Sequence, residues 1–162
     1  MVAYSKFRYF KNPSKYAPFS YPKERLTLQH EDAQNLSFKD NQFDFVFSFS
    51  SIEHFGSRET IEKSMREIQR VLKPGGYAVI STELIVNDAQ HSEYFSRTEL
   101  SKHMIESHEM QLLDNGNIDF SISESTASHV SNTKHMHPVY DLVYNHDGVI
   151  FQPIQLVFKK QD

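Results

Sequence analysis

The chain has 162 residues, no cysteine and only five glycines, a length that suits about one domain. The absence of cysteine excludes disulfides, thiolate metal sites and thiol nucleophiles. No apolar run reaches the ~18 residues of a membrane helix, and the N-terminus lacks the apolar segment of a secretory signal. We therefore expect a cytoplasmic protein that makes no membrane contact. The five glycines form neither a GxGxxG nor a GxxxxGK motif.

Residues 1–25 differ in composition from the rest. They hold six basic residues against one acid, Glu24, together with seven aromatic residues. Such an arm could bind nucleic acid through phosphate contacts and base stacking. A packing arm with solvated Lys and Arg side chains is favoured, because the remainder of the chain is acidic. The sequence predicts a short strand at Val2–Phe10 and two parts: an arm, 1–25, and a domain, 26–162.

The first half of the domain has the pattern of a βαβ unit. A short strand is expected at Arg25–His30, and the apolar Phe43–Phe49 is typical of a strand buried on both faces. A helix from about Arg58 to Leu72 follows, with Ser57 as its N-cap and Pro-Gly-Gly at its end. Tyr77–Thr82 is the next strand. Short loops between these elements predict parallel strands with a right-handed crossover.

The second half begins with a capping box, Ser96 to Glu99, which predicts a helix to about His108. Gln111–Leu113 is expected to be a third parallel strand, and residues 114–138 a long polar loop.

A β-hairpin is predicted near the C-terminus. Tyr140–Tyr144 and Val149–Lys159 flank a turn in which Gly148 suits a position of positive φ. Pro153 inside the second strand indicates a bulge or an edge.

Three segments, in this order, resemble the class I S-adenosylmethionine-dependent methyltransferases. They are Glu31–Asp40, then Phe43–Ser48 followed by Ile52–His54, and then Glu67–Gly76. The resemblance implies an α/β fold: a partial Rossmann-like methyltransferase sheet with parallel strands and a C-terminal antiparallel hairpin. It also implies S-adenosylmethionine as the cofactor.

The resemblance also implies roles for particular residues. In the family, the positions of Asp32 and Ala33 contact the adenine ring, and a carboxylate suits its exocyclic amine. Ser48, Phe49 and Ser50 match the region beneath the methionine part of the cofactor, at the carboxyl end of a strand. The alternatives are a turn residue for Asp32 and a simple strand-to-loop transition for the others.

Glu53 and His54 form the predicted catalytic pair. In related enzymes this stretch faces the methyl acceptor, and a histidine can take a proton from a hydroxyl there. Alternatively, His54 packs beneath the following helix. A second cluster comprises His129, His135, His137 and Asp141, but its spacing is not diagnostic, so we expect no metal site.

The chain departs from the family in its first 25 residues. The acidic, glycine-rich turn that wraps the cofactor is missing, since residues 1–25 contain no glycine. The strands expected there are missing too, which leaves the Phe43–Phe49 strand with an open edge. We expect Val2–Phe10 or a second copy of the chain, as a homodimer, to cover that edge.

The function predicted from these features is methyl transfer from S-adenosylmethionine to a small-molecule or saccharide acceptor, in a domain shortened at its N-terminus. The missing glycine-rich turn leaves two alternatives open. One is a catalytically inactive methyltransferase fold that serves as a binding or regulatory protein. The other is a gene fragment. Nucleic acid is not an expected partner.

Overall fold

A computed structural model of the protein describes residues 13–113, 130–132 and 143–162. The chain divides into two compact units, Met1–Glu31 and Asp32–Asp162. The predicted strand Val2–Phe10 lies outside the described residues. So do the four residues considered for a metal, His129, His135, His137 and Asp141.

The described part of the first unit contains two short 3₁₀ helices, Pro13–Lys15 and Lys23–Arg25. The predicted strand Arg25–His30 is wrong, because residues 26–30 have no regular structure. Pro22, with a φ of −66°, leads instead into the second 3₁₀ turn. Among the described residues no strand pairs with this stretch, and a lone strand has no hydrogen-bonding ladder to hold it extended.

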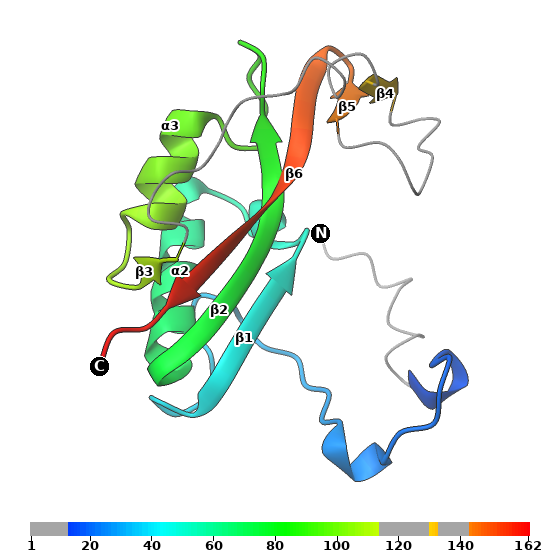
Figure 1. Ribbon diagram of the computed structural model, residues 1–162, viewed down its shortest axis with the longest axis vertical. Coiled ribbons are helices and arrows are strands. Elements are labelled where there is room, and N and C mark those ends of the chain that lie inside the picture. The colour runs from blue at the N-terminus through cyan, green and yellow to red at the C-terminus, as the bar shows by residue number, and fades with distance from the viewer. Residues whose placement is uncertain (1–12, 114–129, 133–142) are drawn as a thin grey trace. The chain divides into compact units, whose positions relative to one another are not determined.

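The second unit is built on a mixed sheet (Figure 1). Its described strands run in the order β1-β2-β6-β5-β4, with β3 beside β6. Their bounds are β1 Phe43–Phe49, β2 Leu72–Ile85, β3 Gln111–Leu112, β4 Val130–Asn132, β5 Val143–His146 and β6 Val149–Lys159. The predicted parallel pairing of the first two strands is confirmed. β2 is longer than predicted, because the chain enters the strand at Leu72, directly after the helix.

Helix α2, Arg58–Val71, is the predicted crossover helix. The Ser57 side chain accepts a hydrogen bond from the Thr60 amide, as an N-cap residue does. Ile61, Met65 and Ile68 are buried, and they recur at the spacing of one helix face. They belong to the same apolar cluster as Ala78 and Ile80 of β2 and Leu156 and Phe158 of β6.

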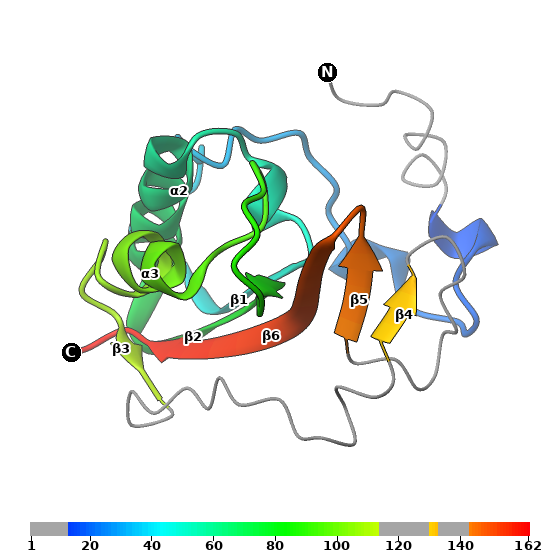
Figure 2. The ribbon, with the colours of Figure 1, turned by 90° about the horizontal axis from the view of Figure 1, so that it is seen from above.

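The capping box is also confirmed: Ser96 and Glu99 bond reciprocally at the start of α3, Arg97–Glu99. The helix continues as a π-helical segment, Leu100–Ile105. Both α2 and α3 lie on one face of the sheet in two perpendicular views (Figure 2).

The strand predicted at Gln111–Leu113 runs in the same direction as β1 and β2, but its partner is different. β3 pairs antiparallel with β6, which separates it from β2. The C-terminal strand lies between β2 and β3, so the expected third strand runs parallel to β2 without pairing with it.

The predicted hairpin is confirmed between β5 and β6, but its first strand runs to His146 and not to Tyr144, and residues 140–142 lie outside the described residues. Asp147 and Gly148 form its turn, with φ values of 49° and 91°, as a two-residue hairpin turn requires. Pro153 pairs with Glu83 of β2, and no described residue pairs with it on the other side. Pro153 therefore occupies an edge position and not a bulge.

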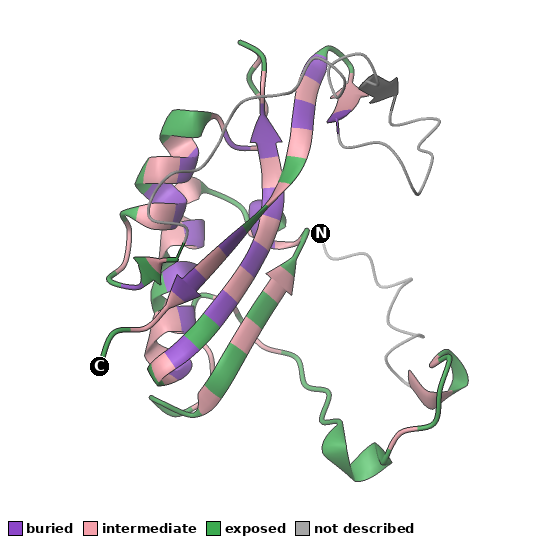
Figure 3. Ribbon diagram, viewed as in Figure 1, coloured by how far each residue is buried: buried purple, intermediate pink, exposed green. Residues whose placement is uncertain are grey.

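The face of β1 opposite the helices carries an exposed row of aromatic side chains. Phe45, Phe47 and Phe49 alternate with Val46 and Ser48, which are less exposed. Figure 3 shows β1 without a buried position, in contrast to β2. The prediction of a strand buried on both faces is therefore wrong, since the described residues place helices on one face only. In the described part of the chain, β1 also has a single paired edge.

Among the described residues, no helix has both the length and the apolar character needed to cross a membrane.

Candidate active site

The loop of residues 32–40 is held on α2 by the side chains of Glu67 and Arg70. Glu67 Oε1 and Oε2 accept hydrogen bonds from Arg70 Nε and Nη2, each over 2.8 Å. Arg70 also donates to the carbonyls of Leu36 and Phe38, and the Leu36 amide donates to Glu67 over 2.8 Å. The carboxylates of Glu67 and Asp40 raise the pKa of Arg70. These bonds fix the backbone that carries two of the predicted cofactor residues, Asp32 and Ala33.

Asp32 is exposed and forms a turn within this segment. Its Oδ1 accepts the Gln34 amide hydrogen over 3.0 Å, and its carbonyl accepts that of Asn35. This geometry is an Asx turn, the alternative role given to Asp32 above. The turn engages Oδ1, while a carboxylate has a second oxygen with which to accept.

Three of the predicted cofactor residues line one groove. Ala33, Ser48 and Phe49 contribute to a groove of about 570 Å³. Its other lining residues are mostly apolar and come from loop 32–40, β1 and α2, among them Leu36, Phe38, Phe43, Val46, Ile68 and Val71. Asp32 and Ser50 are not among the lining residues. An apolar lining of this kind suits an aromatic ring.

β1 ends in a backbone turn with a left-handed residue. Ser50 has a φ of 42°, which is uncommon outside glycine. Its amide donates to the Ser81 carbonyl over 3.1 Å and lies 3.2 Å from the Ser81 hydroxyl, while Ser48 and Ser51 share a hydroxyl bond of 2.8 Å. Strained residues of this kind are enriched at functional sites.

The predicted catalytic pair follows this turn, in the 3₁₀ segment Ile52–His54. Glu53 is fully buried, and its Oε2 accepts the Thr82 hydroxyl hydrogen over 3.2 Å. The His54 side chain is 53% exposed, so it does not pack beneath the helix. Its Nδ1 lies 3.2 Å from Glu93 Oε1, and its Nε2 lies 3.6 Å from Glu53 Oε1. The His54 imidazole therefore lies between the buried carboxylate of Glu53 and the partly exposed carboxylate of Glu93.

Glu83 of β2 belongs to the same cluster but is absent from the sequence-based prediction. Burial raises its pKa to about 7, and the hydrogen bond and charge of the Glu53 carboxyl add to the shift. Burial also raises the pKa of Tyr94, with contributions from Glu83, Glu93 and Glu53. An acid near the end of a largely apolar strand, residues 77–85, is the sequence signal that could have identified Glu83.

Arg58, at the start of α2, holds the segment that carries Glu93 and Tyr94. It donates to the Glu93 carbonyl over 3.0 Å and to the Tyr94 carbonyl over 2.6 Å, and it contacts Glu99 over 3.2 Å. Its guanidinium lies 4.2 Å from the centre of the Phe95 ring. The position of Glu93 beside His54 thus depends on Arg58.

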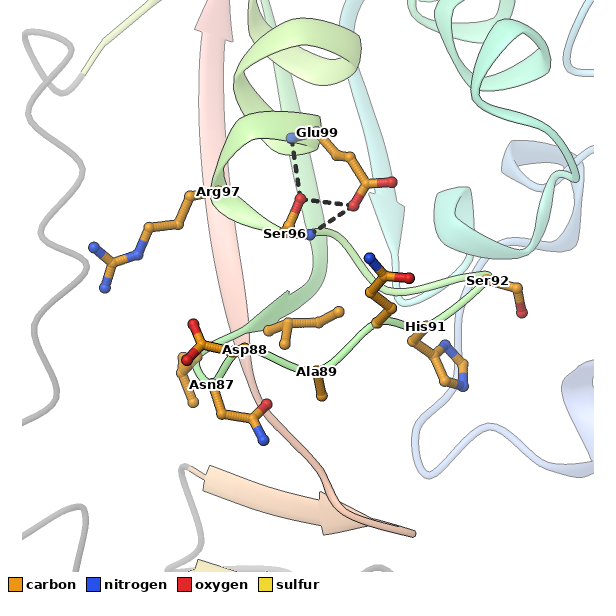
Figure 4. Close-up of a pocket in the computed structure, with 11 residues that line it drawn as sticks. Asn87, Asp88, Ala89, His91, Ser92, Ser96, Arg97 and Glu99 are labelled. Carbon is orange, nitrogen blue, oxygen red and sulfur yellow. Dashed lines mark hydrogen bonds between the residues drawn. The ribbon is translucent and has the colours of Figure 1, made fainter.

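A larger cavity of about 900 Å³ lies beyond the carboxyl end of β2. It is lined by residues 85–92, together with Ser96, Arg97 and Glu99. Figure 4 shows Asp88, Asn87 and Ala89 on the loop, and Ser96 and Glu99 bonded to each other at the start of α3. The loop after β2 therefore supplies both this polar cavity and, further along, Glu93 and Tyr94.

Within the ranges that the structure describes, no three His, Asp or Glu side chains are grouped as metal ligands. The site is defined by a groove on β1, a carboxylate–histidine cluster after β1 and β2, and a polar cavity beyond it. All three lie on an open α/β sheet, and the cluster and the cavity lie at the carboxyl ends of its parallel strands, where ligands bind in this class of fold.

Comparison with known proteins agrees with this architecture. A family model described as a methyltransferase domain matches residues 4–80. The chain is 34% identical over 65 residues to the sterol 4-C-methyltransferase strm-1 of Caenorhabditis elegans, covering 40% of this chain and 19% of that protein. It is 40% identical over 57 residues to a demethylmenaquinone methyltransferase of Bacteroides fragilis, covering 35% and 22%. The chain thus spans about a fifth of the length of these two relatives.

Among solved structures, a methyltransferase from Galdieria sulphuraria matches with a TM-score of 0.56 at 15% identity. The match covers 100% of this chain and 68% of that one, and it supports the fold. Residues 4–80 thus match the methyltransferase domain family, and the whole chain is similar in fold to a methyltransferase.

Proposed function

We propose that the chain transfers a methyl group from S-adenosylmethionine to a hydroxyl or amine of a small molecule or saccharide. The main support is the adjacency of His54, Glu53 and Glu83 at the carboxyl ends of β1 and β2. A family fold alone does not define an activity, whereas this cluster offers a base beside carboxylates where a ligand is expected.

The described residues fit the adenine half of the cofactor. The groove that contains Ala33, Ser48 and Phe49 is apolar and open, and the second oxygen of Asp32 can accept from an exocyclic amine. The ribose and methionine halves have less support, because residues 1–25 contain no glycine for a close backbone approach. When bound, the cofactor supplies a methyl group on a positively charged sulfur.

The chain's own residues then have distinct tasks. Glu93 orients His54 through Nδ1, which leaves Nε2 to take a proton from the acceptor. The polar cavity lined by Asn87, Asp88 and Ser96 is the proposed place of the acceptor. Its lining of amide, carboxylate and hydroxyl groups suits hydrogen bonds to a hydroxylated molecule. Most of the rate enhancement would come from positioning the two reactants.

A second candidate function is binding without turnover, which the missing glycine-rich turn favours. Calorimetric titration with S-adenosylmethionine and with adenosine distinguishes the two. The proposed enzyme binds both ligands, and Asp32→Ala weakens both, whereas Asp44→Ala, which removes another exposed carboxylate, changes neither. Binding of adenosine alone supports the binding protein. If neither ligand produces heat at about millimolar concentration, the cofactor assignment is overturned. A dissociation constant of about 1 mM corresponds to a binding free energy of only ~4 kcal/mol.

Activity is tested separately, by transfer of a labelled methyl group to a panel of hydroxylated and amino acceptors. His54→Asn should lower turnover with little effect on cofactor affinity. Equal turnover by the variant and the parent would exclude His54 as the base.

A further inference from the structure

The segment that carries Glu93 is held by side chains and not by regular secondary structure. Residues 91–94 form neither a helix nor a strand. The amides of Glu93 and Tyr94 both donate to His91 Nδ1, each over 3.2 Å. The carbonyls of the same two residues accept from Arg58, over 3.0 Å and 2.6 Å. Two side chains therefore satisfy the four backbone polar groups that a helix or sheet would otherwise have to satisfy.

This geometry determines which nitrogen of His91 carries the ring hydrogen. In a neutral imidazole one nitrogen donates and the other accepts. Because His91 Nδ1 accepts two amide hydrogens, it cannot carry a hydrogen of its own. The ring is therefore neutral, and its hydrogen lies on Nε2. A cationic ring would place a hydrogen on Nδ1, directly against the two amides.

Aromatic packing keeps the imidazole in this position. The Tyr94 ring stacks on His91 with 3.9 Å between ring centres and 18° between the planes. Tyr94 also packs on Phe151 of β6 at 4.4 Å, and its hydroxyl lies 3.3 Å from Nδ1 of His146 in β5. The acceptor nitrogen of His91 is thus fixed against the C-terminal hairpin, which is distant in the sequence.

Glu93 connects this segment with the predicted base. Its side chain is about half exposed, and its Oε1 lies 3.2 Å from His54 Nδ1. An exposed ion pair between long side chains contributes little on its own, because solvent screens the charges and both side chains lose rotamer freedom. A fixed backbone at residue 93 lowers that cost, since fewer bonds remain free to rotate.

We propose that His91 is a positioning residue for His54. As a neutral imidazole with its hydrogen on Nε2, it accepts the amides of Glu93 and Tyr94 and so holds the Glu93 carboxylate beside His54 Nδ1. Its importance for methyl transfer rests on the function proposed above, in which Glu93 orients His54 and leaves Nε2 to take a proton. His91 acts through Glu93 and does not itself contact the reacting atoms.

The first experiment is nitrogen-15 NMR of the histidine rings in the full chain, without cofactor or acceptor. At neutral pH, His91 should carry its hydrogen on Nε2 and none on Nδ1. His54 should show the opposite tautomer, with its hydrogen on Nδ1, because the Glu93 carboxylate accepts there.

Two variants then separate the hydrogen bond from the ring contact. His91→Asn retains an acceptor, because an Asn side chain bonds backbone amides two residues on, and it should keep the Glu93 and Tyr94 amides protected from exchange. His91→Phe retains the ring but has no acceptor. It should speed exchange of these amides about five- to tenfold and remove the tautomer preference of His54. Gln90→Ala, an exposed change in the same loop, should alter neither.

The proposal is overturned if His91 in the parent carries its hydrogen on Nδ1, or if His91→Asn loses as much amide protection as His91→Phe. If the Phe variant fails to fold, the parent tautomers and the Asn variant still decide the question. Neither readout requires methyl transfer. An inactive protein with both signatures would contradict only the function proposed above, and an active protein with the wrong His91 tautomer would contradict only the role of His91.

Discussion

Arg70 and Glu67 form a two-pronged ion pair, with two guanidinium nitrogens each 2.8 Å from one carboxylate oxygen. The two residues are three apart on α2, and both also bond the backbone of loop 32–40. A helix face therefore determines where the loop carrying Asp32 and Ala33 lies.

Replacing Arg70 with Lys should release this loop. Lysine cannot reproduce the fork of a guanidinium, and lost charge-assisted bonds of this kind cost about 1–3 kcal/mol each at most. We expect a lower free energy of unfolding in urea and faster exchange of the Leu36 amide. Lys73→Met, which removes an exposed pair with Asp44, is the matched control and should change little. Unchanged Leu36 exchange in Arg70→Lys would contradict the anchoring role.

Stability should depend on pH through Glu83. The pKa of this acid is raised from 4.5 to about 7 in the folded chain, so the folded state binds the proton more tightly than the unfolded state. Its contribution to the free energy of unfolding is complete below about 4.5, falls as the pH rises, and is lost above about 7. Urea titrations between these values should show this slope. Glu83→Gln should flatten it, and an equal slope in parent and variant would be evidence against the shifted pKa.

Gly76 should tolerate no side chain. A Cβ atom there would lie 2.8 Å from the Lys73 carbonyl oxygen and 3.0 Å from that of Asp44, and backbone atoms cannot move aside as a flexible side chain can. Gly76→Ala should destabilise the protein by about 1–3 kcal/mol, the usual cost of overpacking. Gly148→Asn is the comparison: nothing lies within 4 Å of that position, so its cost comes from the positive φ alone, which Asn adopts more readily than most residues. A smaller loss for Gly76→Ala than for Gly148→Asn would refute the steric argument.

We expect a second copy of the chain to cover the unpaired edge of β1, and the exposed aromatic row beside that edge should then promote self-association. Phe47 is 62% exposed and stacks on Phe49 at 5.2 Å between ring centres. Phe47→Asp should shift sedimentation towards the monomer and leave the melting temperature nearly unchanged. Leu113→Asp, at an exposed position directly after β3, should not. A parent chain that stays monomeric over a wide concentration range would contradict the homodimer.

The elements with local signals were predictable from the sequence. α2 is marked by Ser57 at its start and by an apolar face that recurs every three to four residues. The capping box at Ser96 and the turn at Gly148 are equally local. Each of these signals comes from residues close together in the sequence, so it could be recognised without knowing any contact between distant parts of the chain.

The other features depend on distant partners. The strand expected at Arg25–His30 has no neighbour among the described residues, and β3 pairs with β6 because the C-terminal strand inserts beside β2. Of the candidate site, Ala33, Ser48 and Phe49 were predicted through family motifs, and they line one groove. Glu83 was missed, because its chemistry arises from its proximity to Glu53, and the sequence separates the two by a whole helix.

The antiparallel ladder between β2 and β6 has a consequence for the order of folding. It joins Tyr77 to Lys159 and Ile85 to Phe151, so one long edge of β2 stays without its partner until residues 151–159 are synthesised. Contacts between distant residues form slowly, and an unpaired apolar strand invites aggregation in the meantime. We therefore expect nascent chains that end before β6 to depend on chaperones, although their local signals for α2 are already complete.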